Sequence, residues 1–172
     1  MPIAVRIHDF YEHAGEIVQN LHGGGVFCAV VDAEGRSNIV TLGWGQIGPF
    51  YHGNPVFSIA ITPLRYSWRF IEAVPEFVIA LPADSHSDAL TLCGTRSGRD
   101  MDKFKSANLT PVPSQVVRAP SVLECPLNIE CRVYAQVAPP HQLLTPEHRR
   151  RPIDEQHTIY FAEVLGCYRY QR

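Results

Sequence analysis

The chain has 172 residues, of which 45% are hydrophobic and 19% are charged. This balance excludes an intrinsically disordered protein and predicts one globular domain with a substantial core. Fifteen Lys and Arg residues against 17 Asp and Glu residues give a formal net charge of −2, and the basic run Arg149–Arg151 is short. A nucleic-acid-binding protein is therefore not expected, because binding to phosphates needs a clustered basic excess.

No apolar run approaches the roughly 18–20 residues that a membrane-spanning helix needs. A secretory signal is not expected either, because Arg6, His8 and Asp9 stand where such a signal requires an unbroken apolar centre. The five cysteines are odd in number and contain no C-x-x-C pair, so neither a disulfide framework nor a metal site is expected. These features predict a cytoplasmic protein whose cysteines are reduced and mostly buried.

The N-terminal half is predicted to begin with a helical lead-in over residues 1–22 and to continue mostly as strands. Apolar residues at helical spacing, Phe10, Ala14, Ile17 and Leu21, indicate the helix. A short helix is predicted after residue 61 and before residue 77, with Thr62 as its cap and Pro63 in its first turn. The expected strands are Val26–Val31 and Arg36–Leu42, which form a hairpin, followed by Val56–Ile61 and Phe77–Leu81.

The C-terminal half is predicted to hold one or two helices and then more strands. The helices lie within Ser85–Leu109 and break at Gly94–Gly98, with Asp100 as an N-cap. Two β-rich runs follow, Asn128–Val137 and His157–Tyr168, separated by a long loop. The order of the elements, with helices inserted between two groups of strands, predicts a single α+β domain that is mainly β. Its antiparallel barrel is expected to occupy residues 23–168.

The start of the helix after Thr62 is the first candidate binding site. A helix N-terminus presents unpaired N–H groups and a partial positive charge, which suit a phosphate. Arg65 and Ser67 would add a cation and a hydroxyl donor there. A plain capped helix remains the alternative interpretation.

Two other segments add candidate residues. Along Asn38–Trp44, Gly43 would let a planar ligand approach the strand backbone, while Trp44 would line a pocket or pack in the core. The Ser97–Gly98 turn leads into a helix in which Lys103 could reach an anion. A lysine on the solvated surface would give the same pattern. The sequence contains no nucleophile elbow, H-E-x-x-H or Walker loop, and its three consecutive glycines precede a strand, which does not support a Rossmann site.

Taken in order, these segments resemble the flavin reductase-like family of FMN-binding split barrels, in particular its flavoredoxin-like branch. The likeness extends from Gly25 to about Val164 and rests on the ordered set of motifs. These are N-x-x-T-x-G-W at Asn38–Trp44, Ile59–Ile61 before Arg65 and Ser67, E-F-V-I-A-L-P at Glu76–Pro82, S-G-R-D-x-D-K-F at Ser97–Phe104, and the pairs Glu124-Cys125 and Glu130-Cys131.

The resemblance implies a single flavin reductase-like domain over residues 1–172 and a homodimer with one FMN per subunit near the interface. It also implies that NADH or NADPH reduces the flavin, with His157 near the nicotinamide. The isoalloxazine edge would lie against the backbone of residues 40–44, and the phosphate would lie at the helix start. The implied FMN-binding residues are Asn38, Val40, Thr41, Leu42, Gly43, Trp44, Arg65, Ser67, Ser97, Gly98 and Lys103.

Two departures from the family pattern affect these implications. An asparagine usual in the family's F-V-x-N-L-P strand is Ala80 here, and the late G-D-H segment reads Glu155-Gln156-His157. Three functions therefore stay open: an NAD(P)H-dependent flavin oxidoreductase, an FMN electron carrier reduced by a partner protein, and a dimeric scaffold without flavin.

Overall fold

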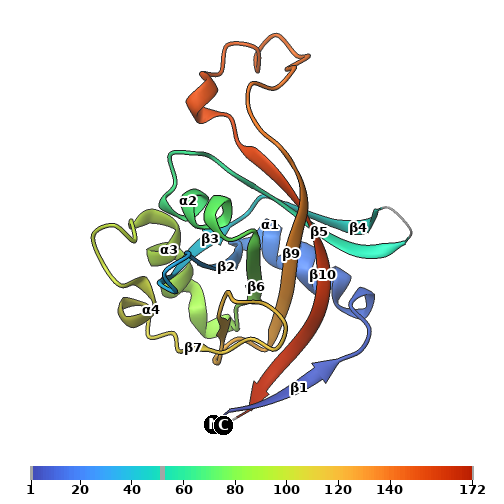
Figure 1. The fold of residues 1–172 in the computed structure, drawn as a ribbon, viewed down its shortest axis with the longest axis vertical. Coiled ribbons are helices and arrows are strands. Elements are labelled where there is room, and N and C mark those ends of the chain that lie inside the picture. The colour runs from blue at the N-terminus through green and yellow to red at the C-terminus, as the bar shows by residue number, and fades with distance from the viewer. Residues whose placement is uncertain (1, 51–52, 172) are drawn as a thin grey trace.

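An antiparallel sheet organises the computed structural model, which describes residues 2–50 and 53–171 (Figure 1). Met1, Tyr51, His52 and Arg172, which the predicted domain includes, lie outside the described residues. The strand order is β3-β2-β6-β9-β10-β5-β4, and β1 pairs with β10. The strands are β1 (Ile3–Ile7), β2 (Val26–Val31), β3 (Ser37–Leu42), β4 (Gly45–Phe50), β5 (Asn54–Ile61), β6 (Glu76–Leu81), β9 (Leu127–Val137) and β10 (Thr158–Gln171).

The helices lie in the connections between strands. In Figure 1, α2, α3 and α4 gather on one side of the sheet, and the segment between β9 and β10 projects away from the rest of the chain. A second, small sheet pairs β7 (Pro111–Val112) with β8 (Ser121–Val122). The helices are α1 (Ala14–Gly23), α2 (Tyr66–Ala73), α3 (Ser87–Thr95) and α4 (Lys103–Ser106), and short 3₁₀ turns cover Tyr11–His13, Asp84–His86 and Ile153–Glu155.

Strand β10 changes one of its partners along its length. Its first part, from Thr158 to Glu163, pairs with β5, whereas its last part, from Cys167 to Gln171, pairs with β1. Its pairing with β9 runs through both parts and has register shifts at Phe161/Ala162 and Val164/Gly166. Bulges of this kind bend a strand and increase its twist. The β10 strand can therefore belong to both halves of an open barrel.

The core lies on both faces of β2, all six residues of which are buried. Cys28 and its neighbours at every second position pack with α1 and α2 residues such as Ile17 and Phe70. The alternate positions, such as Phe27, pack with Cys93 of α3 and Phe104 of α4. A strand covered on both faces reads as a continuous apolar run, which explains why the sequence predicted it.

Three local predictions are wrong. Residues 3–7 of the predicted helical lead-in form strand β1, which pairs with β10. The second helix begins at Tyr66, with Arg65 in the N-cap position, because the Thr62 hydroxyl accepts the Leu64 N–H in a preceding turn instead of capping the helix. Asp102 rather than Asp100 caps α4, because its carboxylate accepts the Lys105 N–H.

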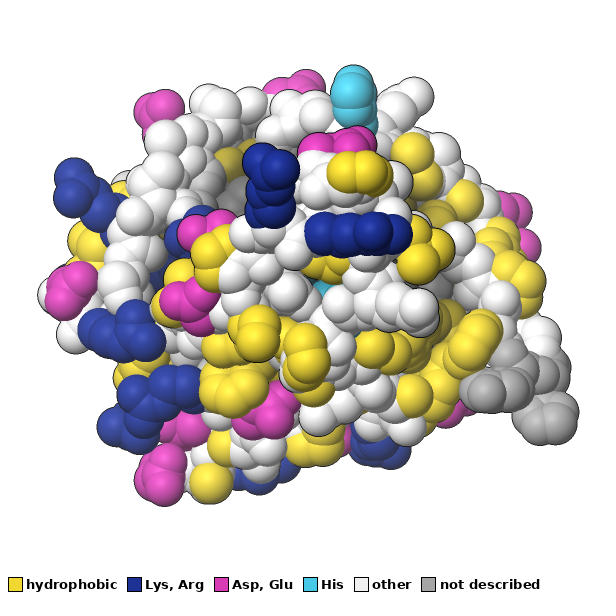
Figure 2. Space-filling model, turned by 90° about the horizontal axis from the view of Figure 1, so that it is seen from above, with side chains coloured by type: hydrophobic (Ala, Val, Ile, Leu, Met, Phe, Trp, Pro, Cys, Tyr) yellow, Lys and Arg dark blue, Asp and Glu magenta, His cyan; other side chains and the backbone are white. Residues whose placement is uncertain are grey.

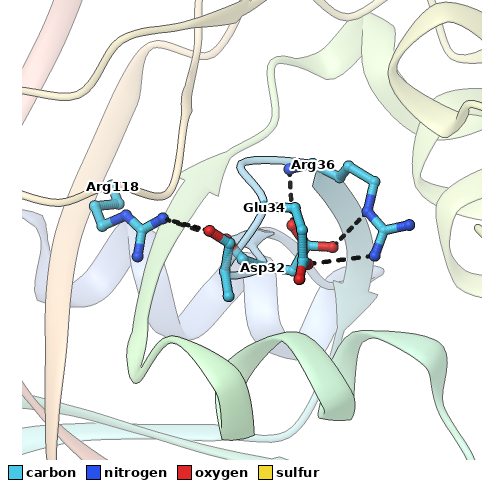
Figure 3. A network of polar contacts seen from close by, with 5 residues as sticks. Asp32, Glu34, Arg36 and Arg118 are labelled. Carbon is cyan, nitrogen blue, oxygen red and sulfur yellow. Dashed lines mark hydrogen bonds and ion pairs between the residues drawn. The ribbon is translucent and has the colours of Figure 1, made fainter.

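The turn between β2 and β3 is held by a polar network (Figure 3). The Asp32 carboxylate accepts hydrogen bonds from the backbone N–H and from Nε of Arg36, at 2.8 and 2.7 Å. Burial raises the pKa of Asp32, but these hydrogen bonds outweigh burial and hold it below its usual value. Arg118 donates to the carbonyl oxygens of Asp32 and Ala33. The network therefore fixes the hairpin whose second strand leads to the site.

The structure also describes the cysteines and the helices that the sequence analysis considered for disulfides and membrane spans. All five cysteines are free and buried. None of the helices in the described part of the chain is long and apolar enough to cross a membrane.

Candidate functional site

A small cavity lies between the start of α2, the segment after α3 and the start of α4. Its volume is about 100 Å³, and we call it the anion cavity. Among the described residues that line it are four cations, Arg65, Arg96, Arg99 and Lys103, and no carboxylate. Such a concentration of positive charge in a small concave site suits an anionic group. The remaining lining residues are Val40, Leu64, Tyr66, Ser67, Thr95, Ser97 and Gly98.

Two of its walls come from the first turn of α2. Arg65 reaches from the N-cap position to donate from Nη1 to the carbonyl oxygen of Gly94, at 3.0 Å. Ser67 is buried, and its Oγ accepts a hydrogen bond from Nδ2 of Asn38, at 3.0 Å. A hydroxyl that accepts one bond still has its own proton to donate. Asn38 is thus buried behind Ser67 and orients it toward the cavity.

The 97–99 turn forms another wall of the anion cavity and packs against Asn38. A Cβ atom added at Gly98 would lie 2.9 Å from Cγ of Asn38 and 3.1 Å from Cδ1 of Tyr66, with the Asn38 oxygen closer still. Only glycine lets the 97–99 turn approach this closely. The Arg99 guanidinium lies over the Tyr66 ring, 5.0 Å from its centroid. The sequence prediction of Ser97 and Gly98 at this site agrees with their place in the wall.

Lys103 is a buried residue that lines the anion cavity. It is 4% exposed, and its Nζ donates to the carbonyl oxygens of Cys93 and Arg96, at 2.8 and 3.3 Å. Burial lowers the pKa of Lys103 to about 8, and the nearby charge of Arg65 acts in the same direction. A lysine on the solvated surface, the alternative interpretation of this motif, is therefore wrong.

A larger cavity of about 290 Å³ adjoins the anion cavity, and we call it the strand cavity. Its walls are the end of β3, the end of β5 and His157. Val40 and Arg65 line both cavities, so the two lie next to each other at these residues. The two neighbouring cavities therefore differ in character, since one is lined mainly by strand residues and the other is cationic. The strand-cavity residues are Val40, Thr41, Leu42, Gly43, Trp44, Ala60, Ile61, Thr62, Arg65 and His157.

The strand cavity is closed on one side by a stacked pair of rings. Trp44 is 56% exposed, and its ring lies 4.4 Å from that of His157 at an interplanar angle of 27°. Core packing of Trp44, one of the two interpretations of the sequence, is therefore wrong. The carbonyl oxygen of His157 accepts a hydrogen bond from Nε2 of His141, at 2.6 Å, which ties the pair to the projecting segment.

The surroundings of His157 favour its neutral form. Burial lowers its pKa first, and the nearby charges of Arg151 and Arg65 lower it further, while a backbone hydrogen bond involving Glu155 raises it in part. A neutral imidazole retains one N–H donor and one acceptor nitrogen. The side chain can therefore orient a ligand by hydrogen bonding without first losing a proton.

Residues 18–171 match the family model described as the flavin reductase like domain. The chain belongs to the flavin reductase-like family. An uncharacterised protein of Archaeoglobus fulgidus is 32% identical over 136 residues, which are 79% of this chain and 67% of that protein. The chain spans about three fifths to two thirds of the curated relatives it matches.

Solved structures agree with this assignment. Flavoredoxin of Desulfovibrio vulgaris (Miyazaki F) is 26% identical with a TM-score of 0.67, covering 83% of this chain and 67% of its own. A flavin reductase-like protein with a split barrel domain from Shewanella frigidimarina is 17% identical with a TM-score of 0.68, covering 94% and 75%. The expected fold, a mainly β split barrel with inserted helices, is confirmed.

The sequence did not predict two arginines of the anion cavity or a third cavity beside Trp44. Arg96 and Arg99 flank the predicted Ser97–Gly98 turn, and their proximity to it was an available signal. A third cavity of about 330 Å³ is also lined by Trp44, and we call it the Trp44 cavity. It shares Gly43, Trp44 and Ala60 with the strand cavity, and its other lining residues are Gly45, Gln46, Ser58, Ile59 and Ile159. Its position depends on strand β4, which the sequence did not predict.

Proposed function

We propose that this protein is an FMN-binding oxidoreductase that uses NADH or NADPH as electron donor. One observation carries the proposal: a cationic cavity and a strand-lined cavity lie next to each other and share Val40 and Arg65. FMN has the matching shape, because its flat ring system and its terminal phosphate are separated by a flexible chain. The names of solved relatives, such as flavoredoxin, agree with flavin binding.

The residues present fit FMN at both ends. At the cationic end, Arg65 and the Ser67 hydroxyl are directed toward a space of about 100 Å³, next to the N-terminal N–H groups of α2. At the other end, Gly43 follows β3 and lines the strand cavity, where the edge of a heterocycle can pair with peptide groups. The contacts are therefore of the kinds that a phosphate ester and a flavin ring require.

The chain's own contributions are binding, orientation and exclusion of water. FMN, when bound, supplies the hydride and electron transfer chemistry. Arg65 would fix the phosphate by a charge-assisted contact, and the residues of β3 and β5 would hold the ring system on a rigid part of the sheet. The stacked pair of Trp44 and His157 would limit access of water from one side, with His157 as a neutral hydrogen-bonding group.

The Trp44 cavity offers room for the second reactant of this oxidoreductase. It adjoins the strand cavity through Gly43, Trp44 and Ala60, so a molecule bound in it would lie beside the ring system. A nicotinamide ring has the flat shape that stacking against Trp44 favours. This position supports a donor that binds directly to the protein.

An FMN electron carrier without a nicotinamide site is the second candidate. It is supported by Glu155 and Gln156, which replace the glycine and aspartate expected before His157. It is also supported by the Trp44 ring, which already stacks on the His157 ring. In that case a partner protein would reduce the flavin.

We also propose that the protein acts as a homodimer. Exposed aromatic rings on the barrel support this, because Phe50 stacks on Phe161 and Tyr134 at centroid distances of 5.4 and 6.0 Å. Figure 2, which views the chain from above, shows further hydrophobic side chains at the surface. Apolar surface of this kind commonly contacts another subunit.

Anaerobic mixing of the FMN-loaded protein with NADH or NADPH tests the proposed function. Prompt bleaching near about 450 nm, a band of the oxidised cofactor, is the expected result. Loaded protein that does not bleach would favour the carrier. Protein that stays colourless after incubation with FMN would contradict both and favour a scaffold.

A further inference from the structure

We propose that Lys103 is a positioning residue of the anion cavity that acts through Arg65 and does not itself ligate the phosphate. This inference rests on the proposed binding of FMN. It assigns to Lys103 a different role from the direct anion contact that its motif suggested. The reason lies in the end of helix α3.

Two successive carbonyl groups near the end of α3 hold two cations. The carbonyl oxygen of Cys93 accepts from Nζ of Lys103 at 2.8 Å, and that of Gly94 accepts from Nη1 of Arg65 at 3.0 Å. A helix C-terminus carries unpaired carbonyls and a partial negative charge, so it stabilises cations placed against it. The end of α3 therefore supports the cations of the cavity from behind.

The bonds made by Lys103 also connect this helix end with the turn that follows it. Its ammonium group bridges the carbonyl oxygens of Cys93 and Arg96, which lie on either side of the last residues of α3. With Lys103 in place, the Gly94 carbonyl is fixed in the position that Arg65 requires. Buried as it is and already bonded to two acceptors, Lys103 has less freedom to turn toward a ligand than Arg65, which is exposed.

A double-mutant cycle measures whether Lys103 acts through Arg65. Apoprotein is titrated with FMN, and with riboflavin as the ligand without phosphate, for wild type, Lys103→Met, Arg65→Ala and the double variant. Lys103→Met should weaken FMN binding about tenfold in the wild-type background and less than about twofold when Arg65 is already alanine, because residues that act as a unit are not additive. Riboflavin affinity should change little in all four proteins.

Lys105→Met is the matched control, because Lys105 lies in the same short helix α4 and is exposed. It should leave FMN affinity within about twofold of wild type, as expected for a surface side chain. If the two main effects add in the cycle, Lys103 contacts the phosphate independently and the inference is wrong. If wild-type apoprotein does not bind FMN at all, the proposed function is wrong instead.

A pH series provides a second measurement if Lys103→Met does not fold. Cys93 and Arg65 act on the pKa of Lys103 through their charges, and Arg96 and Arg99 line the same cavity. Burial raises the pKa of Cys93 to about 11, arginine stays charged, and a phosphate monoester ionises near pH 6, so Lys103 is the group that titrates near pH 8. Between pH 7 and 9, the preference for FMN over riboflavin should fall in wild type and change less than about twofold in Arg65→Ala. An equal fall in both proteins would overturn the inference.

Discussion

Replacement of Gly98 by alanine tests whether the 97–99 turn forms a wall of the anion cavity. The added methyl group would lie 2.9 Å from Cγ of Asn38 and 3.1 Å from the Tyr66 ring, closer than carbon atoms pack in proteins. Gly98 does not have a positive φ, so alanine is compatible with its backbone and the effect is one of packing. Either Asn38 or the turn must therefore move.

Each movement affects the site. If Asn38 moves, its hydrogen bond to the buried Oγ of Ser67 is lost, which costs about 1–3 kcal/mol. If the turn moves instead, the cavity opens on the side of Arg99 and Lys103. Overpacking of this kind destabilises proteins by about 1–3 kcal/mol. These costs lower the free energy of unfolding, and we expect FMN affinity to fall about tenfold, as for the loss of one hydrogen bond to a charged group.

Titration of the apoprotein, followed by quenching of flavin fluorescence, measures this change, and thermal unfolding measures the stability. Gly15→Ala is the control, because a Cβ atom at Gly15 meets nothing within 4 Å and this residue lies in helix α1. It should leave FMN affinity unchanged. Wild-type affinity and stability in Gly98→Ala would show that the turn is not packed against Asn38 as described.

The remaining predictions concern the ligand contacts, the subunits and the buried thiols. Arg65→Ala should weaken FMN binding at least about tenfold, and His157→Ala much less, because only the former removes a charge-assisted phosphate contact; equal affinities of the two variants would refute this assignment. Flavin retention should fall on dilution as dimers dissociate, whereas a monomer that keeps all its flavin in sedimentation would show that the interface is not part of the site. Burial raises the pKa of all five cysteines above the value near 9 of an unfolded chain. Their contribution to stability is therefore complete below about pH 9 and is lost as the pH rises, by about 1 kcal/mol per thiol between pH 9 and 10. The lowered pKa of Lys103 makes stability rise with pH over part of this range, but it is a single group. An apoprotein whose Tm is constant from pH 8 to 10.5 would therefore contradict the burial of the thiols.

The elements that the sequence predicted well are those whose own composition favours a strand. Strands β2 and β6 are continuous β-favouring runs, and both were expected. Strand β4 was missed because Gly45, Gly48 and Pro49 give it a poor strand composition, and it forms by pairing with β5. Strand β1 was interpreted as part of a helical segment, since its extended form depends on the end of β10.

The site could be predicted in part for similar reasons. Arg65, Ser67 and Gly98 belong to local motifs with a recognisable chemistry, and the structure brings them together around one cavity. The inward direction of Lys103 could not be predicted, because it depends on carbonyl groups ten and seven residues earlier in the chain. The stacking of Trp44 likewise could not be predicted, because its partner His157 lies far away in the sequence.

The central claim is that the cavity at the start of α2 binds the phosphate of a flavin mononucleotide. The most direct test is titration of wild-type apoprotein with FMN and with riboflavin under identical conditions. Riboflavin lacks the phosphate, and its loss should remove at least one strong charge-assisted contact, so FMN should bind at least about tenfold more tightly. Equal dissociation constants for the two flavins would contradict the phosphate site and leave the start of α2 as a plain helix terminus.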